Sequence, residues 1–148
     1  MEQILAQAKK VAEAAEVFTV SSEQTPVEFE TNRLKHIQTK QSSSTALRII
    51  RNGRIGYATT TGLEASQNLV DMAVETAQFG TPGGFEFPSS TNYPRITVYD
   101  PEVESVTLSE MVRLGEEMIA AATGHTPDII CEAGITRSAT SVSIKNSR

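Results

Sequence analysis

The stretch Ser44–Thr60, STALRIIRNGRIGYATT, constrains the fold more than any other part of the sequence. Its central dipeptide, Asn52-Gly53, favours a two-residue type I′ turn, because that turn needs positive φ at both central residues. Apolar and polar side chains alternate on both sides of the dipeptide, as in strands with one buried face. Arg51 and Arg54 flank the turn, where their charged side chains can extend into solvent and discourage pairing at a sheet edge. We therefore expect a long two-stranded ribbon at the middle of an antiparallel sheet.

Size and charge narrow the class of protein. The 148 residues, 39% of them hydrophobic, suit one compact domain or two small subdomains that share a core. The net charge of −5 gives no overall field that attracts nucleic acid or an anionic membrane. No apolar run approaches the roughly 20 residues of a membrane span. A single cysteine, Cys131, excludes an intrachain disulfide and suits a reducing cytoplasm.

Three stretches have the apolar periodicity of amphipathic helices. The first covers residues 2–15. The second begins at a capping box, Thr61 to Glu64, and ends at Gly80 before Pro82. The third begins at the capping box Thr107 to Glu110 and ends near Gly124. The predicted inward faces are Leu69, Val70, Ala73, Val74 and Ala77 in the second helix, and Leu108, Met111, Val112, Leu114, Gly115, Met118 and Ile119 in the third.

Strands are predicted before the ribbon and at the end of the chain. Glu16–Ser22 and Val27–Glu30 are separated by a break at Pro26, because proline and its polar neighbours interrupt the pattern. A turn at Thr31–Arg33 leads to a strand over Leu34–Gln41. Leu34 and Ile37 are out of step with period 2, which predicts a bulge. The remaining expected pieces are a long irregular connection at 80–94, a short extended piece at Arg95–Tyr99, and strands at Asp128–Thr136 and Thr140–Asn146.

The end of the chain echoes its beginning. Val27 and Phe29 recur 115 positions later as Val142 and Ile144, which indicates a duplicated helix-and-hairpin unit. The second copy stops at Arg148, so we expect an N-terminal domain of a longer protein. The predicted fold class is α+β, an antiparallel sheet built from hairpins with about three helices packed on it. Its expected parts are a first subdomain at 1–80, a connection at 81–106 and the start of a second subdomain at 107–148.

The sequence offers no clear catalytic or metal-binding set. His36 and His125 are far apart, with no HExxH pair, and are expected on a sheet surface and in a post-helix loop. Cys131 reads as a small buried hydrophobe in a strand. Glu28 and Glu30 share a strand face and could form an acid pair, although an exposed face is the better interpretation.

The other charged or glycine-rich groups have structural interpretations. Gly80–Gly84 is not followed by Lys-Ser or Lys-Thr, so a phosphate loop is not expected. Two pairs of charged residues lie one helical turn apart, Asp71 with Glu75 and Lys9 with Glu13. We interpret both pairs as parts of solvent-exposed helix faces. We therefore predict no catalytic, cofactor-binding or metal residue here. The basic residues of the strand region, read as a solvated sheet face, are Arg33, Lys35, Lys40, Arg48, Arg51 and Arg54.

Three segments resemble the N-terminal domain of the TldD/PmbA (TldE) family, formerly called modulators of DNA gyrase. They are VEFETNRLKHIQ (27–38), ALRIIRNGRIGYATTTGL (46–63) and ITRSATSVSIKNS (135–147). The family strand R-v-x-x-x-G-x-x-G-[fy]-a-[st]-[st] corresponds to residues 48–60. Asn146-Ser147 resembles the start of the family's N-S-x-G turn, and Tyr99-Asp100-Pro101 resembles the PmbA branch.

The resemblance implies a cytoplasmic zinc metallopeptidase that acts on unfolded peptides. TldD-like members carry an HExxxH zinc motif later in the chain, whereas PmbA-like members lack it and pair with the catalytic subunit. HExxxH does not occur in these 148 residues, so the resemblance assigns no site residue here and places any zinc in the full-length assembly. It implies a sheet that shapes the peptide chamber and a homo- or heterodimer. An unfolded peptide could add to an exposed strand edge.

Two other readings stay open. One is a free-standing binding or assembly module without enzymatic activity, which a reading frame that continues past Arg148 would distinguish from the family domain. The other is a small hydrolase that uses Ser, Thr or carboxylate side chains, which predicts turnover by the 148-residue chain alone. Whether the chain belongs to an enzyme is left open at this point, and DNA binding is disfavoured by the acidic net charge.

Overall fold

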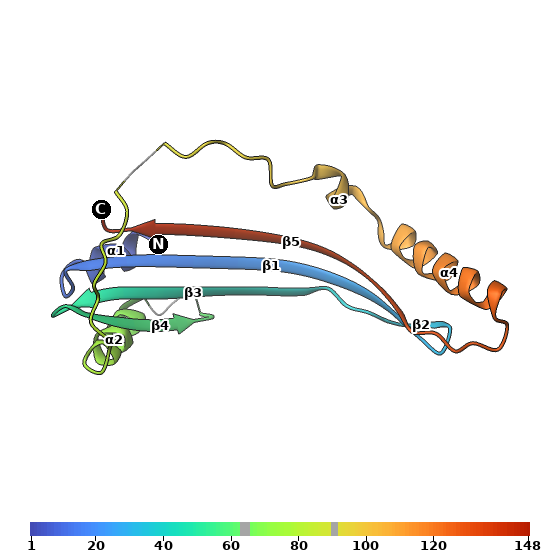
Figure 1. The fold of residues 1–148 in the computed structure, drawn as a ribbon, viewed down its shortest axis with the longest axis horizontal. Helices are drawn as coiled ribbons and strands as arrows, with labels where there is room; N and C mark the ends of the chain where they lie inside the picture. The colour runs from blue at the N-terminus through green and yellow to red at the C-terminus, as the bar shows by residue number, and fades with distance from the viewer. Residues whose placement is uncertain (63–65, 90–91) are drawn as a thin grey trace. The chain divides into compact units, whose positions relative to one another are not determined.

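The computed structural model describes residues 1–62, 66–89 and 92–148. Within these ranges the chain forms helices and strands of an α+β protein (Figure 1). In chain order they are α1 (Glu2–Ala8), β1 (Ala14–Glu30), β2 (Arg33–Ile37), β3 (Lys40–Arg51), β4 (Arg54–Thr60), α2 (Ser66–Ala77), α3 (Pro101–Ser105), α4 (Leu108–His125) and β5 (Ala133–Asn146). None of the described helices is both long and apolar enough to cross a membrane.

The chain divides into two compact units. Unit 1 comprises Met1–Ser21, Ser42–Pro94 and Ser141–Arg148, and unit 2 comprises Ser22–Gln41 and Arg95–Thr140. Strands β1, β3 and β5 each contribute residues to both units. The sequence-based division into subdomains at residues 80 and 107 concerns a longer protein and stays a prediction, as does the duplication of a helix-and-hairpin unit.

The sheet is antiparallel, and β1 is its most connected strand. The strand order is β2-β1-β3-β4, and β5 also pairs with β1. The prediction that the β3–β4 ribbon lies at the middle is therefore wrong, since β4 is at the end of the order. The physical reason is the length of β1, which has 17 residues. Its Val27–Glu30 part pairs with β2, and the strand also pairs with β3 and with β5.

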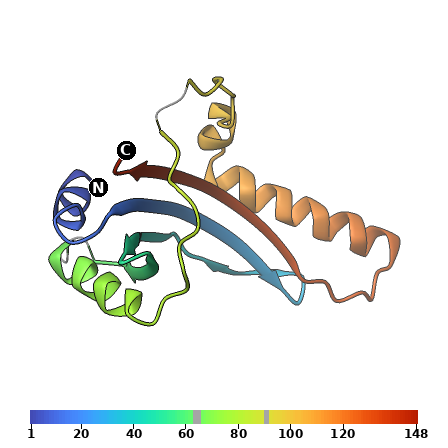
Figure 2. The same cartoon turned by 60° about the vertical axis from the view of Figure 1, so that its left-hand side comes forward.

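The β3–β4 hairpin of unit 1 confirms the turn that the sequence predicts. Its register runs from Thr45 opposite Thr60 to Arg51 opposite Arg54, which leaves a two-residue loop. Asn52 has φ 50° and Gly53 has φ 67°, the positive values that a type I′ turn needs. Helices α1 and α2 pack beside these strands (Figures 1 and 2). The buried core of unit 1 is Leu5, Ala8, Ala15, Val17, Leu47, Ile49, Ala58, Leu69, Val70, Ala73 and Ala77.

Unit 2 contains the β1–β2 hairpin and α4. Thr31 and Asn32 form its turn with φ 53° and 63°. The register shifts between Glu28, opposite His36, and Phe29, opposite Leu34, so Lys35 is the extra residue of the predicted bulge. Helix α4, continuous in Figure 2, has both halves of the predicted capping box. The core of unit 2 is Val27, Phe29, Met111 and Ile119.

Several predicted boundaries are wrong. Helix α1 ends at Ala8 and not at residue 15, because Glu13 N already donates to Ile50 O at 2.9 Å and Ala15 is buried in the sheet. Strand β1 continues through Pro26, whose carbonyl accepts a hydrogen bond from Gln38 N at 3.4 Å, so the missing N–H does not end the strand.

The C-terminal half also differs from the prediction. β5 is one strand beginning at Ala133, where two strands were expected, and 95–99 is irregular instead of extended. Helix α3 was missed, although Asp100 caps it and Pro101 occupies its first position. On α4, Met111, Gly115 and Ile119 are buried as predicted, but Leu108, Leu114 and Met118 are exposed. The capping box predicted at 61–64 includes residues that lie outside the described ranges.

Candidate functional site

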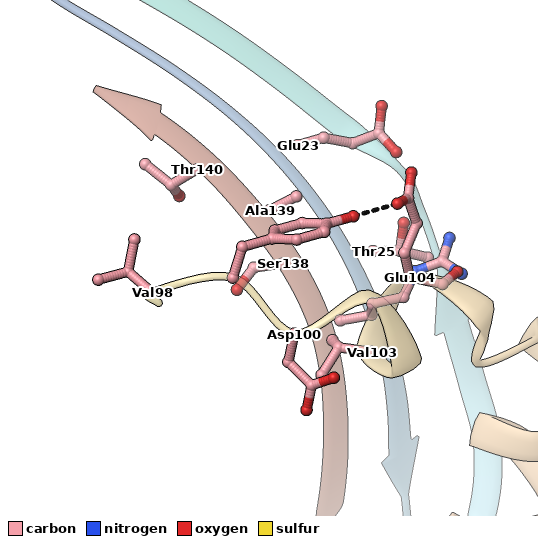
Figure 3. A pocket seen from close by; sticks show the side chains of 11 residues that line it. Glu23, Thr25, Val98, Asp100, Val103, Glu104, Ser138, Ala139 and Thr140 are labelled. Atoms are coloured by element: carbon pink, nitrogen blue, oxygen red, sulfur yellow. Dashed lines mark hydrogen bonds between the residues drawn. The ribbon is translucent and has the colours of Figure 1, made fainter. Parts of the chain in front are cut away.

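A cavity in unit 2 is the first candidate site. Its volume is about 520 Å³. Strand β1 contributes Glu23 and Thr25 to its wall, β5 contributes residues 137–140, and the segment around α3 contributes Val98–Asp100, Val103 and Glu104 (Figure 3). The walls are therefore mixed, with carboxylates and hydroxyls beside valine and tyrosine side chains. Such a lining suits binding of a small polar group or a side chain.

The carboxylates of this cavity already have partners in the chain. Tyr99 donates its hydroxyl hydrogen bond to Glu104 Oε2, the bond dashed in Figure 3, and this bond raises the pKa of Tyr99. Asp100 Oδ1 accepts from Glu102 N at 2.9 Å and begins α3. Glu23 Oε2 accepts from Gln41 Nε2 at 2.6 Å. These acids therefore hold the wall of the cavity together.

Arg137 and the hydroxyls have similar roles. Arg137 Nη1 donates to the carbonyls of Glu104 and Val106, which joins β5 to the end of α3. The Thr25 hydroxyl is 3.1 Å from that of Thr39, and the Thr140 hydroxyl is 3.1 Å from that of Ser22. The hydroxyls of Thr25 and Thr140 therefore pair with other hydroxyls and not with a general base, so the geometry fits a binding cavity better than a nucleophilic centre.

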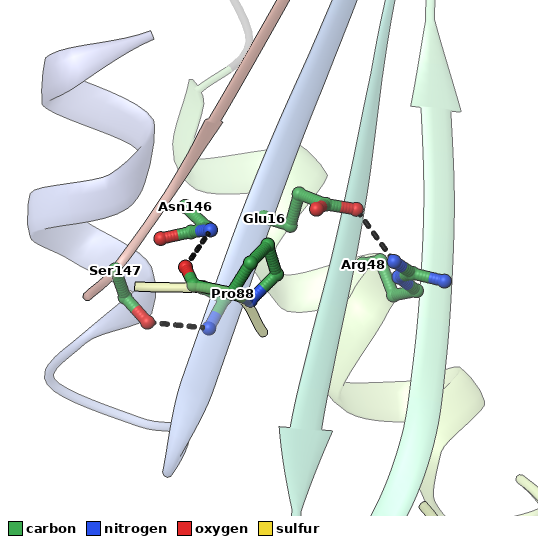
Figure 4. Close-up of polar contacts among 6 residues, drawn as sticks. Glu16, Arg48, Pro88, Asn146 and Ser147 are labelled. Carbon is green, nitrogen blue, oxygen red and sulfur yellow. Dashed lines mark hydrogen bonds and ion pairs between the residues drawn. The ribbon is translucent and has the colours of Figure 1, made fainter. Parts of the chain in front are cut away.

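Arg48 forms the centre of a second cluster, in unit 1. Its Nη2 donates to Glu16 Oε1 at 2.6 Å (Figure 4). Its Cζ lies 4.9 Å from the ring centroid of Phe85 and 5.1 Å from that of Phe87, a cation–π arrangement. The interpretation of Arg48 as part of a solvated basic face is wrong, since its side chain is 34% exposed and that of Glu16 only 18%.

The same cluster fixes the irregular segment 85–88. Phe87 is buried and packs edge-on against Phe85, with ring centroids 5.5 Å apart. Asn146 Nδ2 donates to Pro88 O at 2.9 Å (Figure 4). Ser147 is fixed in turn, because Ala15 N donates to its Oγ at 3.0 Å and its own N donates to Ala15 O at 2.8 Å. The Asn-Ser pair at the end of the chain therefore holds a segment in place.

Comparison with known proteins identifies the domain type. The family model described as PmbA/TldA metallopeptidase domain 1 matches residues 15–77. Residues 15–77 therefore belong to the first domain of the PmbA/TldD family. The matched range contains the β1–β2 hairpin, the β3–β4 ribbon and α2. No curated protein matches the chain.

Solved structures agree with this PmbA/TldD fold. TldE from Thermococcus kodakarensis aligns with a TM-score of 0.86 at 18% identity over 99% of this chain and 34% of that chain. A proposed modulator of DNA gyrase from Thermotoga maritima gives 0.80 at 14% identity over 99% and 34%. Another from Bacteroides thetaiotaomicron gives 0.72 at 14% identity over 99% and 35%. This PmbA/TldD domain thus spans about a third of those chains, and the likeness concerns the fold.

The residues singled out in the sequence are scattered over the PmbA/TldD fold. His36 is exposed on β2, as predicted, with Nε2 3.2 Å from Gln38 Oε1. His125 is the last residue of α4 and not part of a loop. Cys131 lies in an irregular segment and is half-buried, where a buried strand position was predicted. Its N–H donates to Asn32 Oδ1 at 2.7 Å, which fixes the chain at this point.

The acidic candidates lie on exposed faces, as the sequence predicts. Glu28 and Glu30 are exposed, and Glu30 Oε2 is 3.4 Å from Lys35 Nζ. In residues 1–62, 66–89 and 92–148, no three His, Cys, Asp or Glu side chains are placed to hold a metal ion. The described residues therefore do not fit a zinc site, which needs at least three protein ligands.

Sequence reasoning identified neither the unit 2 cavity nor the Arg48 cluster. The alternation in Phe85-Glu86-Phe87, inside a Gly- and Pro-rich segment, was the available signal for the Arg48 cluster. Asp100-Pro101 was the signal for α3, and so for the wall of the cavity, because Asp at the cap and Pro at the first position favour a helix start.

Proposed function

We propose that this chain is the non-catalytic N-terminal domain of a TldD/PmbA-type zinc metallopeptidase or of its partner subunit. In this role its sheet shapes the chamber that receives an unfolded peptide, and the full-length protein forms a homo- or heterodimer with a TldD/PmbA-like subunit in the cytoplasm. The observation that supports the proposal most is the match of residues 15–77 to the first domain of that metallopeptidase family.

Two features of the structure support a role other than catalysis. The described residues offer no zinc ligand set. The hydroxyls of Thr25 and Thr140 in the unit 2 cavity pair with other hydroxyls. In the proposal, zinc is therefore held elsewhere in the assembly. The partner-subunit (PmbA or TldE) branch is the preferred reading, supported by the fold shared with TldE and by the Tyr99-Asp100-Pro101 stretch.

Peptide binding in this role uses the backbone. An extended peptide adds to an exposed strand edge, where main-chain hydrogen bonds give affinity with little dependence on side chains. Isothermal titration of this chain with a reduced, unfolded peptide is expected to give measurable heat. A folded protein of the same composition serves as control. No heat with the unfolded peptide would count against this step for the isolated domain.

The test of the main proposal uses the full reading frame that contains this chain. The full-length protein is expressed alone and together with a family member that carries HExxxH. We expect peptidase activity on an unfolded peptide and one zinc-bearing subunit only in the combined sample. Zinc retained by the 148-residue chain alone, measured by plasma mass spectrometry, or turnover by that chain, would overturn the proposal.

A free-standing binding module is the second candidate. The mixed walls of the unit 2 cavity favour it, since a cavity of about 520 Å³ can bind a small ligand without any enzyme context. A reading frame that ends with this domain, together with an unchanged sedimentation profile in the presence of family subunits, is the result expected for a module. Formation of a stable complex with an HExxxH-bearing subunit would exclude it.

A further inference from the structure

The outer edge of β4 should be open, yet the chain's own atoms occupy it. β4 ends the strand order β2-β1-β3-β4, and a strand in that position normally presents unpaired N–H and C=O groups. Here Tyr57 N donates to Thr76 Oγ1 at 2.9 Å, and the Thr76 hydroxyl shares its one proton between Tyr57 O at 2.8 Å and Ala73 O of its own helix at 3.0 Å. One hydroxyl of α2 thus occupies the donor and the acceptor that another strand would use.

The neighbouring edge position is occupied in the same way. Ile55 N donates to Thr81 O at 2.9 Å, and Arg54 forms an isolated antiparallel bridge with Pro82. Residues 55 and 57 are two apart, so their main-chain groups point to the same side of the strand. The outward amides at these two positions are therefore both satisfied from within unit 1.

Two glycines allow this close approach. A Cβ on Gly56 would lie 2.1 Å from Ala73 O, and a Cβ on Gly80 would lie 1.8 Å from Ile55 O. Any larger side chain at either position would push α2 or the turn after it away from β4. Close backbone contacts at these two glycines therefore hold α2 and the following turn against β4, and Thr76 adds the hydrogen bonds to Tyr57.

We propose that Thr76 seals the β4 edge and prevents β4 from pairing with β4 of a second copy of this chain. Antiparallel pairing about Tyr57 would place the two Tyr57 side chains, 55% exposed in the structure, opposite each other. It would place Arg54 opposite Thr60, so no like charges would meet. The pairing is self-complementary, and it needs the outward amides of both Ile55 and Tyr57, so the Thr76 hydroxyl opposes it together with the carbonyl of Thr81.

The experiment compares two substitutions that differ in one functional group. Thr76→Val keeps the shape of the side chain and removes the hydroxyl, whereas Thr76→Ser keeps the hydroxyl. We expect the Tyr57 amide of the valine variant to exchange with deuterium roughly five- to tenfold faster. We also expect sedimentation to show a further step of association relative to the wild-type chain at equal concentration. The serine variant should match the wild type in both.

Several results would overturn the proposal. Equal exchange rates of the Tyr57 amide in the valine and serine variants would show that the Thr76 hydroxyl does not protect the β4 edge. Faster exchange without added association would contradict the claim that the seal prevents pairing with a second copy of this chain. Binding of an unfolded peptide in place of self-association would contradict it as well. If circular dichroism shows that the valine variant is unfolded, Thr76→Ala replaces it under the same criteria. The proposal depends on β4 alone, so it can fail while the proposed function stands.

Discussion

Gly115 of α4 lies directly against the ring of Phe29, so that a Cβ on residue 115 would be 2.1 Å from Phe29 Cε2. Phe29 is only 2% exposed, so its ring has little room to move. Gly115→Ala should therefore cost about 1–3 kcal/mol by overpacking. The helix-forming advantage of alanine, about 1 kcal/mol, offsets only part of that cost. Urea denaturation measures the net loss of unfolding free energy.

Gly124 provides the matched control on the same helix. A Cβ there would meet nothing within 4 Å. Gly124→Ala is thus expected to stabilise the chain by about 0.5–1 kcal/mol, because alanine loses less backbone entropy than glycine on folding. If both variants are stabilised, Phe29 is not packed against α4 as the structure has it.

The β3–β4 turn gives a second prediction. Gly53 has φ 67°, and a Cβ there would meet nothing within 4 Å, so any penalty comes from the backbone alone. Gly53→Ala should reduce the unfolding free energy by about 1–2 kcal/mol, because alanine disfavours the left-handed region. Thermal unfolding provides the measurement, with Gly134→Ala as control, since that position also has no atom within 4 Å and no positive φ. Equal melting temperatures for the two variants would contradict the turn geometry.

The capping box of α4 makes stability depend on pH. The backbone N–H of Thr107, and then its hydroxyl, donate to Glu110 and lower the pKa of that carboxyl. A carboxyl whose pKa is lower in the folded chain stabilises the fold above its ordinary range, and this contribution is lost as the pH falls through the lowered value. Glu110→Gln should therefore have a lower free energy of unfolding in urea than the wild type near neutral pH, and the difference should shrink as the pH falls through the lowered pKa of Glu110.

Thr107→Ala tests the other half of the box. It removes the oxygen that accepts from Glu110 N at 3.2 Å and should cost about 1 kcal/mol of unfolding free energy. Thr107→Ser, which keeps the hydroxyl, should restore most of that loss. A pH-independent difference between Glu110→Gln and the wild type would show that the ionised carboxyl does not act at this cap.

The Arg48–Glu16 pair can be measured by a double-mutant cycle. With Glu16→Gln, Arg48→Met and the double variant, we expect a coupling energy of roughly 1 kcal/mol, since the pair is only partly screened by water. The comparison pair is Arg113 with Glu117, whose side chains are both 59% exposed. Its coupling should stay below about 0.5 kcal/mol. Equal coupling in the two pairs would mean that burial beside Phe85 and Phe87 adds nothing.

Local chemistry explains what could be predicted from the sequence. The Asn52-Gly53 turn and the Thr107–Glu110 capping box depend on a few neighbouring residues, and both are present in the structure. The bulge at Lys35 was predictable because one residue out of step changes the face of every later side chain. The overall α+β class follows from these elements.

Long-range pairing decided the features that could not be predicted. Alanine-rich residues 9–15 favour a helix by propensity, but pairing with β3 and burial of Ala15 make the last of them part of β1. Pro26 is tolerated because its carbonyl, not its nitrogen, pairs with Gln38. The Arg48 cluster and the unit 2 cavity each join segments far apart in sequence, which periodicity and spacing do not reveal.

Each of the two units is built from separate stretches of the chain. The chain passes from one unit to the other at 21/22, 41/42, 94/95 and 140/141. A deletion from either terminus therefore cannot remove unit 2 without first taking residues from unit 1. Shortened versions of this polypeptide should lose structure in both parts at once, and isolating either part requires rejoining its ends in a circularly permuted or linker-bridged gene.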